Sequence, residues 1–319
     1  MKIKITCLLM LIGLALFGQQ DTSTIAAQLA KGLQLKEEGN FSEAISILDS
    51  VATDLKTQAN WEKYIETKVT VIYAHISMDS LGIAQQLIDQ LTEEGNQYLT
   101  EPHHQLLNIQ EAQVILYRTS GLYEKGMASA KKVIEERKLL FDETHPSLYK
   151  MYRELGRMHN DLSDYEVAID YLKKGLFIIE KQYGKNHEIA AELYRGIGTN
   201  YAYKGKPAEA IPFYEKALKV NQVVYGSQSL QAANAYVMMG SIFCRIEQCS
   251  KGERNLLKAL AIYKAILGED SYDVGVAYLN LSTFYYYVPD YEKMLLYANK
   301  AVGILQQSSR TNNTNLVYA

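Results

Sequence analysis

Small residues that recur at a spacing of 42 constrain what this chain can fold into more than any other feature of its sequence. Gly156, Gly198 and Gly240 stand two equal intervals apart within the 319 residues. The same phase continues forward to Ser282 and, with a slip of two at its start, backward to Val114, Ile72 and Gly32. A fixed period of this length is typical of repeat proteins, in which similar small units stack on their neighbours.

Two further columns of mostly small residues run parallel to this first column. The second column follows 12 residues later and comprises Ala44, Ala84, Gly126, Ala168, Ala210, Gly252 and Met294. The third follows 19 residues later and comprises Val51, Leu91, Val133, Gly175, Ala217, Ala259 and Ala301. Packed helices approach most closely where the facing side chains are small. We therefore expect the first two columns to mark the crossing of two helices within a repeat, and the third to mark the contact with the next repeat.

Turn-forming residues lie between the first and second columns and divide each repeat into two helices. They include Gly39, Gly121, Ser163, Gly205 and Pro289. The apolar residues on either side follow a helical period, and no strand-like alternation competes with it. The sequence thus predicts an all-α fold of helix–turn–helix units. We place these repeats near residues 25–58, 60–93, 102–141, 145–184, 187–226, 229–268 and 271–307.

The fourth and fifth copies resemble the tetratricopeptide repeat in the 42-residue form of kinesin light chains and their bacterial relatives. The matching residues of the fourth copy are His145, Pro146, Leu155, Gly156, His159, Asp164, Tyr165, Ala168, Tyr171, Leu172, Gly175, Leu176, Tyr183 and Gly184. Those of the fifth are His187, Ala190, Ile197, Gly198, Tyr201, Gly205, Ala210, Tyr214, Ala217, Leu218, Tyr225 and Gly226. The resemblance covers residues 25–307. It implies a right-handed superhelical α-solenoid of about seven antiparallel helix pairs.

The resemblance also explains an unusual composition, with 25 Tyr against seven Phe and one Trp. It places large aromatic residues in the core between helices, with their hydroxyls at its edge. The tyrosines at these positions are Tyr165, Tyr171, Tyr183, Tyr201, Tyr214 and Tyr225.

The first residues have the pattern of a signal peptide. Lys2 and Lys4 precede an apolar run over residues 5–17, and Gly18 offers a small residue for cleavage. This leader resembles those of exported Bacteroidetes-like proteins. We expect residues 1–18 to be removed and the protein to be exported, to the periplasm or to the extracellular or cell-surface space of a bacterium. No second apolar stretch is long enough to span a membrane.

Without the leader, the chain would be mildly acidic and would keep two cysteines. Loss of Lys2 and Lys4 with the leader changes the net charge from −3 to −5, which does not suggest a nucleic-acid partner. Cys244 and Cys249 would remain in a compartment where disulfides persist. Within one helix their Cα atoms would lie about 7.5 Å apart along the axis, too far for a bond. A turn between them would permit a disulfide; the alternative is two small buried apolar residues.

No motif for catalysis or for metal binding is recognisable. His103, His145 and His187 repeat at the spacing of 42, but equivalent positions of a solenoid lie a repeat apart and cannot converge on one ion. No zinc-protease motif, phosphate-binding glycine loop or nucleophile elbow occurs. We therefore predict no enzyme activity, no metal and no cofactor.

The family resemblance assigns the first helix of each repeat to the concave wall, where a partner would bind. Its middle would be basic and its C-terminal end apolar and aromatic, which suits a protein or peptide with acidic residues followed by an apolar anchor. The candidate residues are Arg118, Lys150, Arg153, Arg157, Asn160, Arg195, Tyr203, Val237, Val276, Leu279, Tyr286 and Tyr287. The alternative is that the charges pair along their own helices, for example with Glu154. The paired Asn of kinesin light chains is missing here except at Asn280, so their cargo recognition is not transferred.

The last repeat ends on an apolar helix. We expect this helix over residues 291–305, followed by a polar tail over 308–319 with no capping helix. A solenoid needs a polar cap, so the exposed helix suggests self-association, a docked partner or further sequence. The predicted function is a protein-interaction scaffold. The alternative is the N-terminal regulatory half of a larger signalling protein or CHAT-type peptidase.

Overall fold

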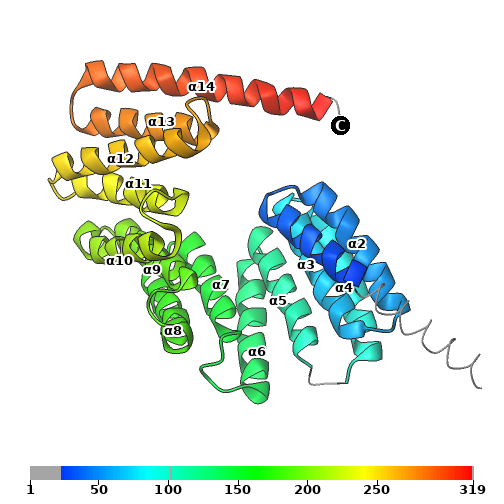
Figure 1. Cartoon of the computed structure of the whole chain (residues 1–319). Helices are drawn as coiled ribbons and strands as arrows, with labels where there is room; N and C mark the ends of the chain where they lie inside the picture. Colours follow the sequence, from blue (N-terminus) through cyan, green and yellow to red (C-terminus); the bar gives the residue numbers. More distant parts are fainter. Residues whose placement is uncertain (1–22, 101–102, 318–319) are drawn as a thin grey trace, which may run out of the picture. The chain divides into compact units, whose positions relative to one another are not determined.

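A computed structural model describes residues 23–100 and 103–317, with side chains described as far as residue 307 (Figure 1). The predicted signal peptide and all side chains of the predicted tail lie outside this part. All regular structure within it is helical. A first helix covers residues 23–37, and it is followed by α2 (Phe41–Thr57), α3 (Trp61–Ser77), α4 (Leu81–Tyr98), α5 (His104–Thr119), α6 (Tyr123–Leu140), α7 (Leu148–Asp161), α8 (Tyr165–Tyr183), α9 (Glu188–Tyr203), α10 (Pro207–Tyr225), α11 (Leu230–Cys244), α12 (Cys249–Leu267), α13 (Tyr272–Tyr287) and α14 (Tyr291–Val317).

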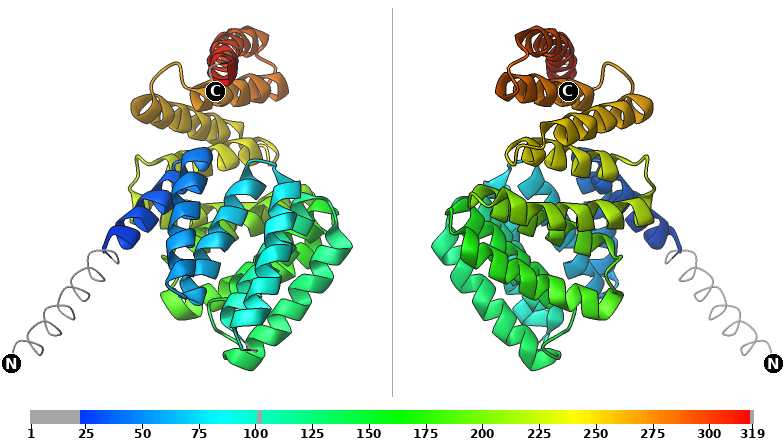
Figure 2. Two further views of the ribbon diagram at one scale, coloured as in Figure 1. Left: turned by 90° about the vertical axis from the view of Figure 1, so that its right-hand side faces the viewer. Right: turned by 90° about the vertical axis from the view of Figure 1, so that its left-hand side faces the viewer.

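The described helices form seven antiparallel pairs, as the period of 42 predicts. We call the first helix of a pair its A helix and the second its B helix. The chain divides into two compact units, Met1–Asp142 and Glu143–Ala319. The first unit contains three pairs, ending with α6. The second contains four pairs, α7 to α14, which Figure 2 shows from two sides in green to red.

The first two columns of small residues lie where an A helix crosses its B helix, which confirms their predicted role. A Cβ atom added to Gly156 would come within 3.2 Å of the Ala168 carbonyl oxygen. One added to Gly252 would lie 2.7 Å from the Gly240 carbonyl oxygen. A larger residue would therefore force the backbones apart at Gly252 and would be tight at Gly156. The third column has a broader role than predicted, since a Cβ at Gly175 would meet its own A helix as closely as the next one.

The tyrosines are placed differently from the prediction. Of the six predicted core tyrosines, Tyr214 is buried, but Tyr183 and Tyr225 are 52% and 41% exposed. The buried tyrosines are Tyr64, Tyr194, Tyr214, Tyr263, Tyr278 and Tyr285. Three of them donate a hydroxyl proton to a carboxylate on the adjacent helix, as Tyr194 does to Glu180. Burial, followed by these hydrogen bonds, raises the pKa of Tyr64, Tyr194 and Tyr285.

The last helix is longer than predicted. It continues beyond residue 305 to Val317, so the start of the predicted tail is helical. Ala301 is buried against α13, and Ile304 and Leu305 lie over Gly275. The opposite side is exposed, and we call it the outer face of α14; it comprises Tyr291, Leu295, Leu296 and Val302. Among the described residues, no helix is long and apolar enough to cross a membrane.

The two late cysteines form a disulfide. Cys244 is the last residue of α11 and Cys249 the first of α12, so a turn of four residues separates them. Their Cα atoms lie 4.0 Å apart. The intervening turn is what makes the bond possible, and the alternative of two separate buried thiols is wrong.

Candidate functional site

Most of the predicted site residues lie on the A helices of the second unit. Lys150, Arg153, Arg157 and Asn160 are on α7, and Arg195 and Tyr203 are on α9. Val237 is on α11, while α13 carries Val276, Leu279, Tyr286 and Tyr287. Arg118 belongs to α5 of the first unit, where it is half-buried.

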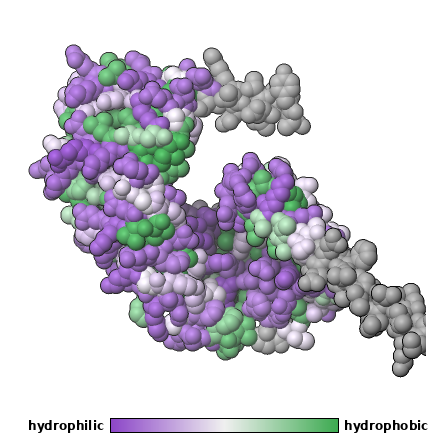
Figure 3. All heavy atoms as spheres, in the orientation of Figure 1, coloured by the Kyte–Doolittle hydropathy of each residue, from purple (hydrophilic) through white to green (hydrophobic). Residues whose placement is uncertain are grey.

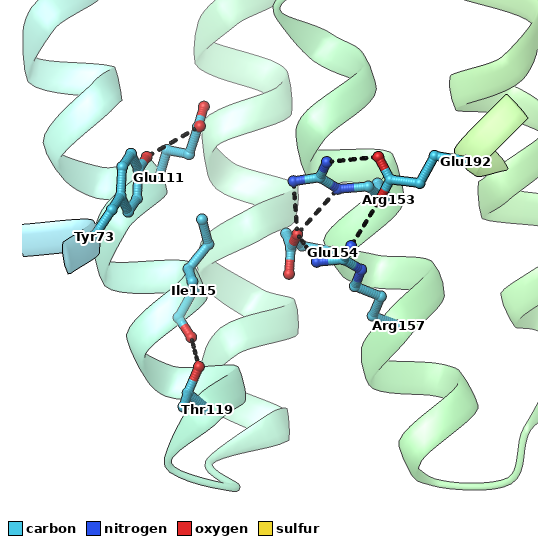
Figure 4. Close-up of polar contacts among 8 residues, drawn as sticks. All are labelled: Tyr73, Glu111, Ile115, Thr119, Arg153, Glu154, Arg157 and Glu192. Atoms are coloured by element: carbon cyan, nitrogen blue, oxygen red, sulfur yellow. Dashed lines mark hydrogen bonds and ion pairs between the residues drawn. The ribbon is translucent and has the colours of Figure 1, made fainter. Parts of the chain in front are cut away.

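The centre of this surface is a cluster of two arginines and two glutamates (Figure 4). Arg153 lies 3.2 Å from Glu154 and 3.3 Å from Glu192, measured between nitrogen and oxygen atoms. Arg157 lies 3.2 Å from Glu154 and 2.7 Å from Glu192. The Glu154 side chain is only 1% exposed. We call these four residues the charge cluster.

The charge cluster has no net charge. Burial lowers the pKa of Arg153, but Glu192 and Glu154 outweigh this effect and raise it. The structure therefore favours the alternative of paired charges for Arg153 and Arg157, in place of a free basic stripe. The i,i+3 pair of Arg157 with Glu154 could be predicted, whereas the bonds to Glu192 come from the next A helix.

Next to this cluster, α9, α10 and α11 enclose a pocket of about 300 Å³. Arg195 lines it, is exposed, and forms no ion pair with any described residue. Two carboxylates share the wall: Glu192 of the charge cluster and Glu188, which accepts a hydrogen bond from the Tyr225 hydroxyl. The Asn234 side chain also lines it and accepts a 2.6 Å hydrogen bond from Tyr263. We call this the Arg195 pocket.

The remaining polar candidates on α7 and α9 have different surroundings. Asn160 donates its amide to Asn200 on α9, at 3.0 Å, and so joins two A helices. Lys150 is half-buried. Tyr203 is exposed, and its ring lies 5.8 Å from that of Tyr165. None of the three lines the Arg195 pocket.

A larger cavity, of about 850 Å³, lies between α11, α12 and α13. We call it the disulfide cavity because Cys244 and Cys249 line it. The other lining residues are Ser241, Arg245, Glu247, Leu256, Asn280, Thr283, Phe284 and Tyr287. Of the five apolar candidates, Tyr287 alone lines it, with 72% of its surface exposed.

The other apolar candidates lie outside that cavity. Leu279 and Tyr286 are exposed, and Val237 and Val276 are half-buried. In the orientation of Figure 1, hydrophobic atoms gather on the surface over α13 (Figure 3). The predicted apolar end is therefore an open surface beside a cavity.

Two of the three histidines spaced by 42 cap A helices. His103 Nδ1 accepts the backbone N–H of Gln105, and His187 Nδ1 accepts that of Ile189, both at 3.2 Å. This role satisfies a backbone donor that would otherwise have no partner in the first helical turn. His145 Nδ1 accepts the backbone N–H of Ser147, the residue before α7, at 3.3 Å. Within the described part of the chain, no group of three or more His, Cys, Asp or Glu could hold a metal ion.

Sequence reasoning also missed a buried ion pair in the first unit. Arg137 of α6 lies 2.7 Å from Glu111 of α5, with both side chains at most 3% exposed. Glu111 also accepts a hydrogen bond from the Tyr73 hydroxyl at 3.1 Å (Figure 4). Arg137 donates to Asn108 as well, at 3.1 Å. These contacts connect α3, α5 and α6, and no helical period in the sequence indicates them.

Stacked hairpins that cross at glycines define an α-helical repeat protein. Residues 147–222 match the family model described as tetratricopeptide repeat. This segment, which contains most of the fourth and fifth copies, belongs to the tetratricopeptide repeat family, as the residues of those copies indicate.

Solved structures share this fold at low sequence identity. The Rap conjugation gene regulator of plasmid pLS20, in complex with the Phr* peptide, aligns with a TM-score of 0.63 and 15% identity over 90% of this chain and 75% of that one. The apo form of RapI aligns with a TM-score of 0.60 and 15% identity over 90% and 99%. BtubC from P. vanneervenii aligns with a TM-score of 0.59 and 15% identity over 77% and 92%. No curated protein sequence matches the chain.

Proposed function

We propose that this protein is a non-enzymatic scaffold that binds an extended peptide or protein segment along the A helices of its second unit. The observation that carries this proposal is the exposed, unpaired guanidinium of Arg195 in a pocket on α9. The disulfide cavity lies one pair further along the same unit. The peptide in the similar Rap regulator structure supports the same kind of partner for this fold.

The charges around Arg195 define which segment would fit. Arg153 and Arg157 already neutralise Glu154 and Glu192, so they offer an acidic ligand little. Arg195 can form a charge-assisted hydrogen bond with one carboxylate, whereas Glu188 would repel a second one beside it. The segment we propose therefore carries a single acidic residue, followed by an apolar anchor.

A second feature suits an extended backbone. Asn280 lines the disulfide cavity, and its amide forms no hydrogen bond with the described residues. A side-chain amide offers a donor and an acceptor together, which matches one peptide group. The acidic contact, the backbone contact and the apolar cavity would thus follow each other along one ligand.

Export is part of the same proposal. The Cys244–Cys249 disulfide supports it, because such bonds persist in oxidising compartments and are rare in the reducing cytosol. An intact mass that matches a chain beginning at Gln19 in the exported fraction would bear out both the leader and the compartment. A full-length mass confined to the cytosol would refute them.

The binding test uses fluorescein-labelled nonapeptides of alanine and serine that carry one Glu and one Phe, with two to six residues between these two. Fluorescence anisotropy should identify a preferred spacing for the wild-type protein. Arg195→Glu should weaken this peptide about tenfold or more, because a hydrogen bond to a charged group contributes roughly 1.5–3 kcal/mol.

The matched control is Arg254→Glu, which makes the same change at an exposed arginine on the B helix α12. It should bind like the wild type. A peptide with Lys in place of Glu should in turn prefer the Arg195→Glu protein. If no spacing gives binding, or if both variants bind alike, the proposed function is wrong.

A further inference from the structure

The turn between α11 and α12 departs from the regularity of the array. The A helices α3, α5, α7, α9 and α13 each end five residues after their first-column residue. The helix α11 ends at Cys244, only four residues after Gly240. The backbone N–H of Arg245 bonds to the Ile242 carbonyl, three residues back, whereas that of Lys204 at the end of α9 bonds to Asn200, four residues back. The last turn of α11 is therefore tightened to the 3₁₀ type.

The disulfide accounts for this departure. It joins the last residue of α11 to the first of α12, and it holds their Cα atoms 4.0 Å apart. The left-handed residue of this turn, Glu247 with a φ of 62°, is shared with the equivalent turns, as at Gly205 and Ser163, so the departure is confined to the end of α11. Arg245 is turned away from α11 and donates to the Ala202 carbonyl at the end of α9, at 3.1 Å.

The same turn forms one side of the disulfide cavity. Cys244, Cys249, Arg245 and Glu247 line it from the turn, and four α13 residues line it from the opposite side. Ser241 and Thr283 donate their hydroxyls to carbonyls of their own helices, so they do not offer free hydrogen-bond donors to a ligand.

One part of the lining of this cavity is apolar. Leu256, Phe284 and the ring of Tyr287 contribute to it together with the two sulfur atoms, whereas Arg245, Glu247 and Asn280 form the polar part. Its volume of about 850 Å³ lies in the range of small-ligand sites and can accept a large side chain.

We propose that the disulfide cavity takes the aromatic or branched apolar side chain of the bound segment, and that opening the disulfide weakens this site. The proposal rests on the proposed function and adds that reduction of the disulfide regulates binding of the segment. Without the bond, Arg245 is free to become the fifth residue of α11, as in the other pairs. The wall of the cavity would then change at Arg245, and the two sulfurs would no longer be held together in it.

The chemical step is a thiol–disulfide exchange with a dithiol reductant. One thiolate of the reductant attacks a sulfur of the Cys244–Cys249 bond and forms a mixed disulfide. The second thiolate then displaces the protein sulfur. Two electrons pass from the reductant to the protein, which takes up two protons and ends as two thiols, while the reductant becomes a cyclic disulfide.

The first experiment measures the turn itself, without a ligand. We use the full chain with Cys7→Ser, in which Cys244 and Cys249 are the only cysteines. Hydrogen–deuterium exchange with dithiothreitol should rise over residues 241–252 and stay unchanged over 200–210, the equivalent turn of the previous pair. Cys244→Ser/Cys249→Ser protein should show the faster exchange with or without dithiothreitol. Equal exchange in the oxidised and reduced chains would refute the proposed regulation by the disulfide.

The second experiment measures the anchor site with the labelled Glu–Phe nonapeptide of preferred spacing. Reduction should weaken its binding about fivefold, or about 1 kcal/mol, while the peptide with Phe→Ala should bind both forms with the same lower affinity. Equal affinity of the Phe peptide for both forms would overturn the control by the disulfide and leave the proposed function standing. Binding to neither form would overturn the anchor site together with the proposed function.

Discussion

Replacement of Gly252 by alanine tests whether the crossing of α11 and α12 depends on the absence of a side chain. The added Cβ would lie 2.7 Å from the Gly240 carbonyl oxygen and 3.1 Å from a ring carbon of Phe284. The first neighbour is backbone and cannot rotate away, so one helix must move by roughly half an ångström to restore contact distance.

Two effects of opposite sign determine how much the substitution changes the free energy of unfolding. Overpacking of a tight core contact costs about 1–3 kcal/mol. Alanine has a better helix propensity than glycine by about 1 kcal/mol, which offsets part of that cost. We expect Gly252→Ala to lower the free energy of unfolding by about 1–2 kcal/mol.

Urea unfolding followed by circular dichroism measures this change, with Gly303→Ala as the matched control. Gly303 is also inside a helix, α14, but a Cβ there would meet nothing within 4 Å. The same substitution should therefore stabilise at that position, by about 0.5–1 kcal/mol. If Gly252→Ala were as stable as Gly303→Ala, the inference that the close approach of the two backbones requires glycine at position 252 would be refuted.

Four further perturbations test other contacts. His187→Ala should cost about 1 kcal/mol of stability in the same assay because the N-cap acceptor is lost, and His187→Asn should restore most of it. Glu111→Gln should cost about 3–5 kcal/mol of stability, because it removes one charge of a buried ion pair. Glu111→Leu combined with Arg137→Met should recover most of that loss, and an equal loss in the single and double variants would contradict this. Burial, and then Asp273, raise the pKa of Tyr263 from 10.0 to about 12. Its contribution to stability is therefore complete below pH 10 and is lost between pH 10 and 12. Tyr263→Phe should flatten that decline when unfolding is measured as a function of pH. Leu295→Glu on the outer face of α14 should abolish the concentration-dependent association that we predict for the wild type in sedimentation, and a wild type that stays monomeric at high concentration would refute that self-association.

The crossings of the helix pairs could be predicted because they depend on residue size alone. A residue without a side chain at Gly240 and another at Gly252 repeat the pattern of Gly156 and Ala168, and a close approach of helices is the simplest physical reason. The number of pairs and most turn positions follow from the same columns.

The charges of the candidate site could not be predicted in the same way. Whether Arg153 and Arg157 face solvent or each other's counter-ions depends on how α9 is rotated against α7, which places Glu192 between them. That rotation results from packing along the whole pair and leaves no local mark in the sequence. Arg195 belongs to the same helix as Glu192 yet faces the pocket, for the same reason.

The disulfide depended on where α11 ends. Helical periodicity locates an element more securely than its end, and Cys244 and Cys249 can bond only if α11 ends between them. The tyrosines show a related limit, since the residue type alone does not distinguish the buried Tyr194 from the exposed Tyr183.

The neutral charge cluster has a consequence for how fast an acidic partner can find this surface. Long-range attraction depends on net charge, and two arginines paired with two glutamates contribute almost none beyond a Debye length of about 8 Å at physiological ionic strength. The field that a ligand meets on α9 then comes mainly from single side chains such as Arg195. Association should consequently proceed at the ordinary rate of an unsteered encounter, roughly 10⁵–10⁶ M⁻¹s⁻¹, and change little with added salt.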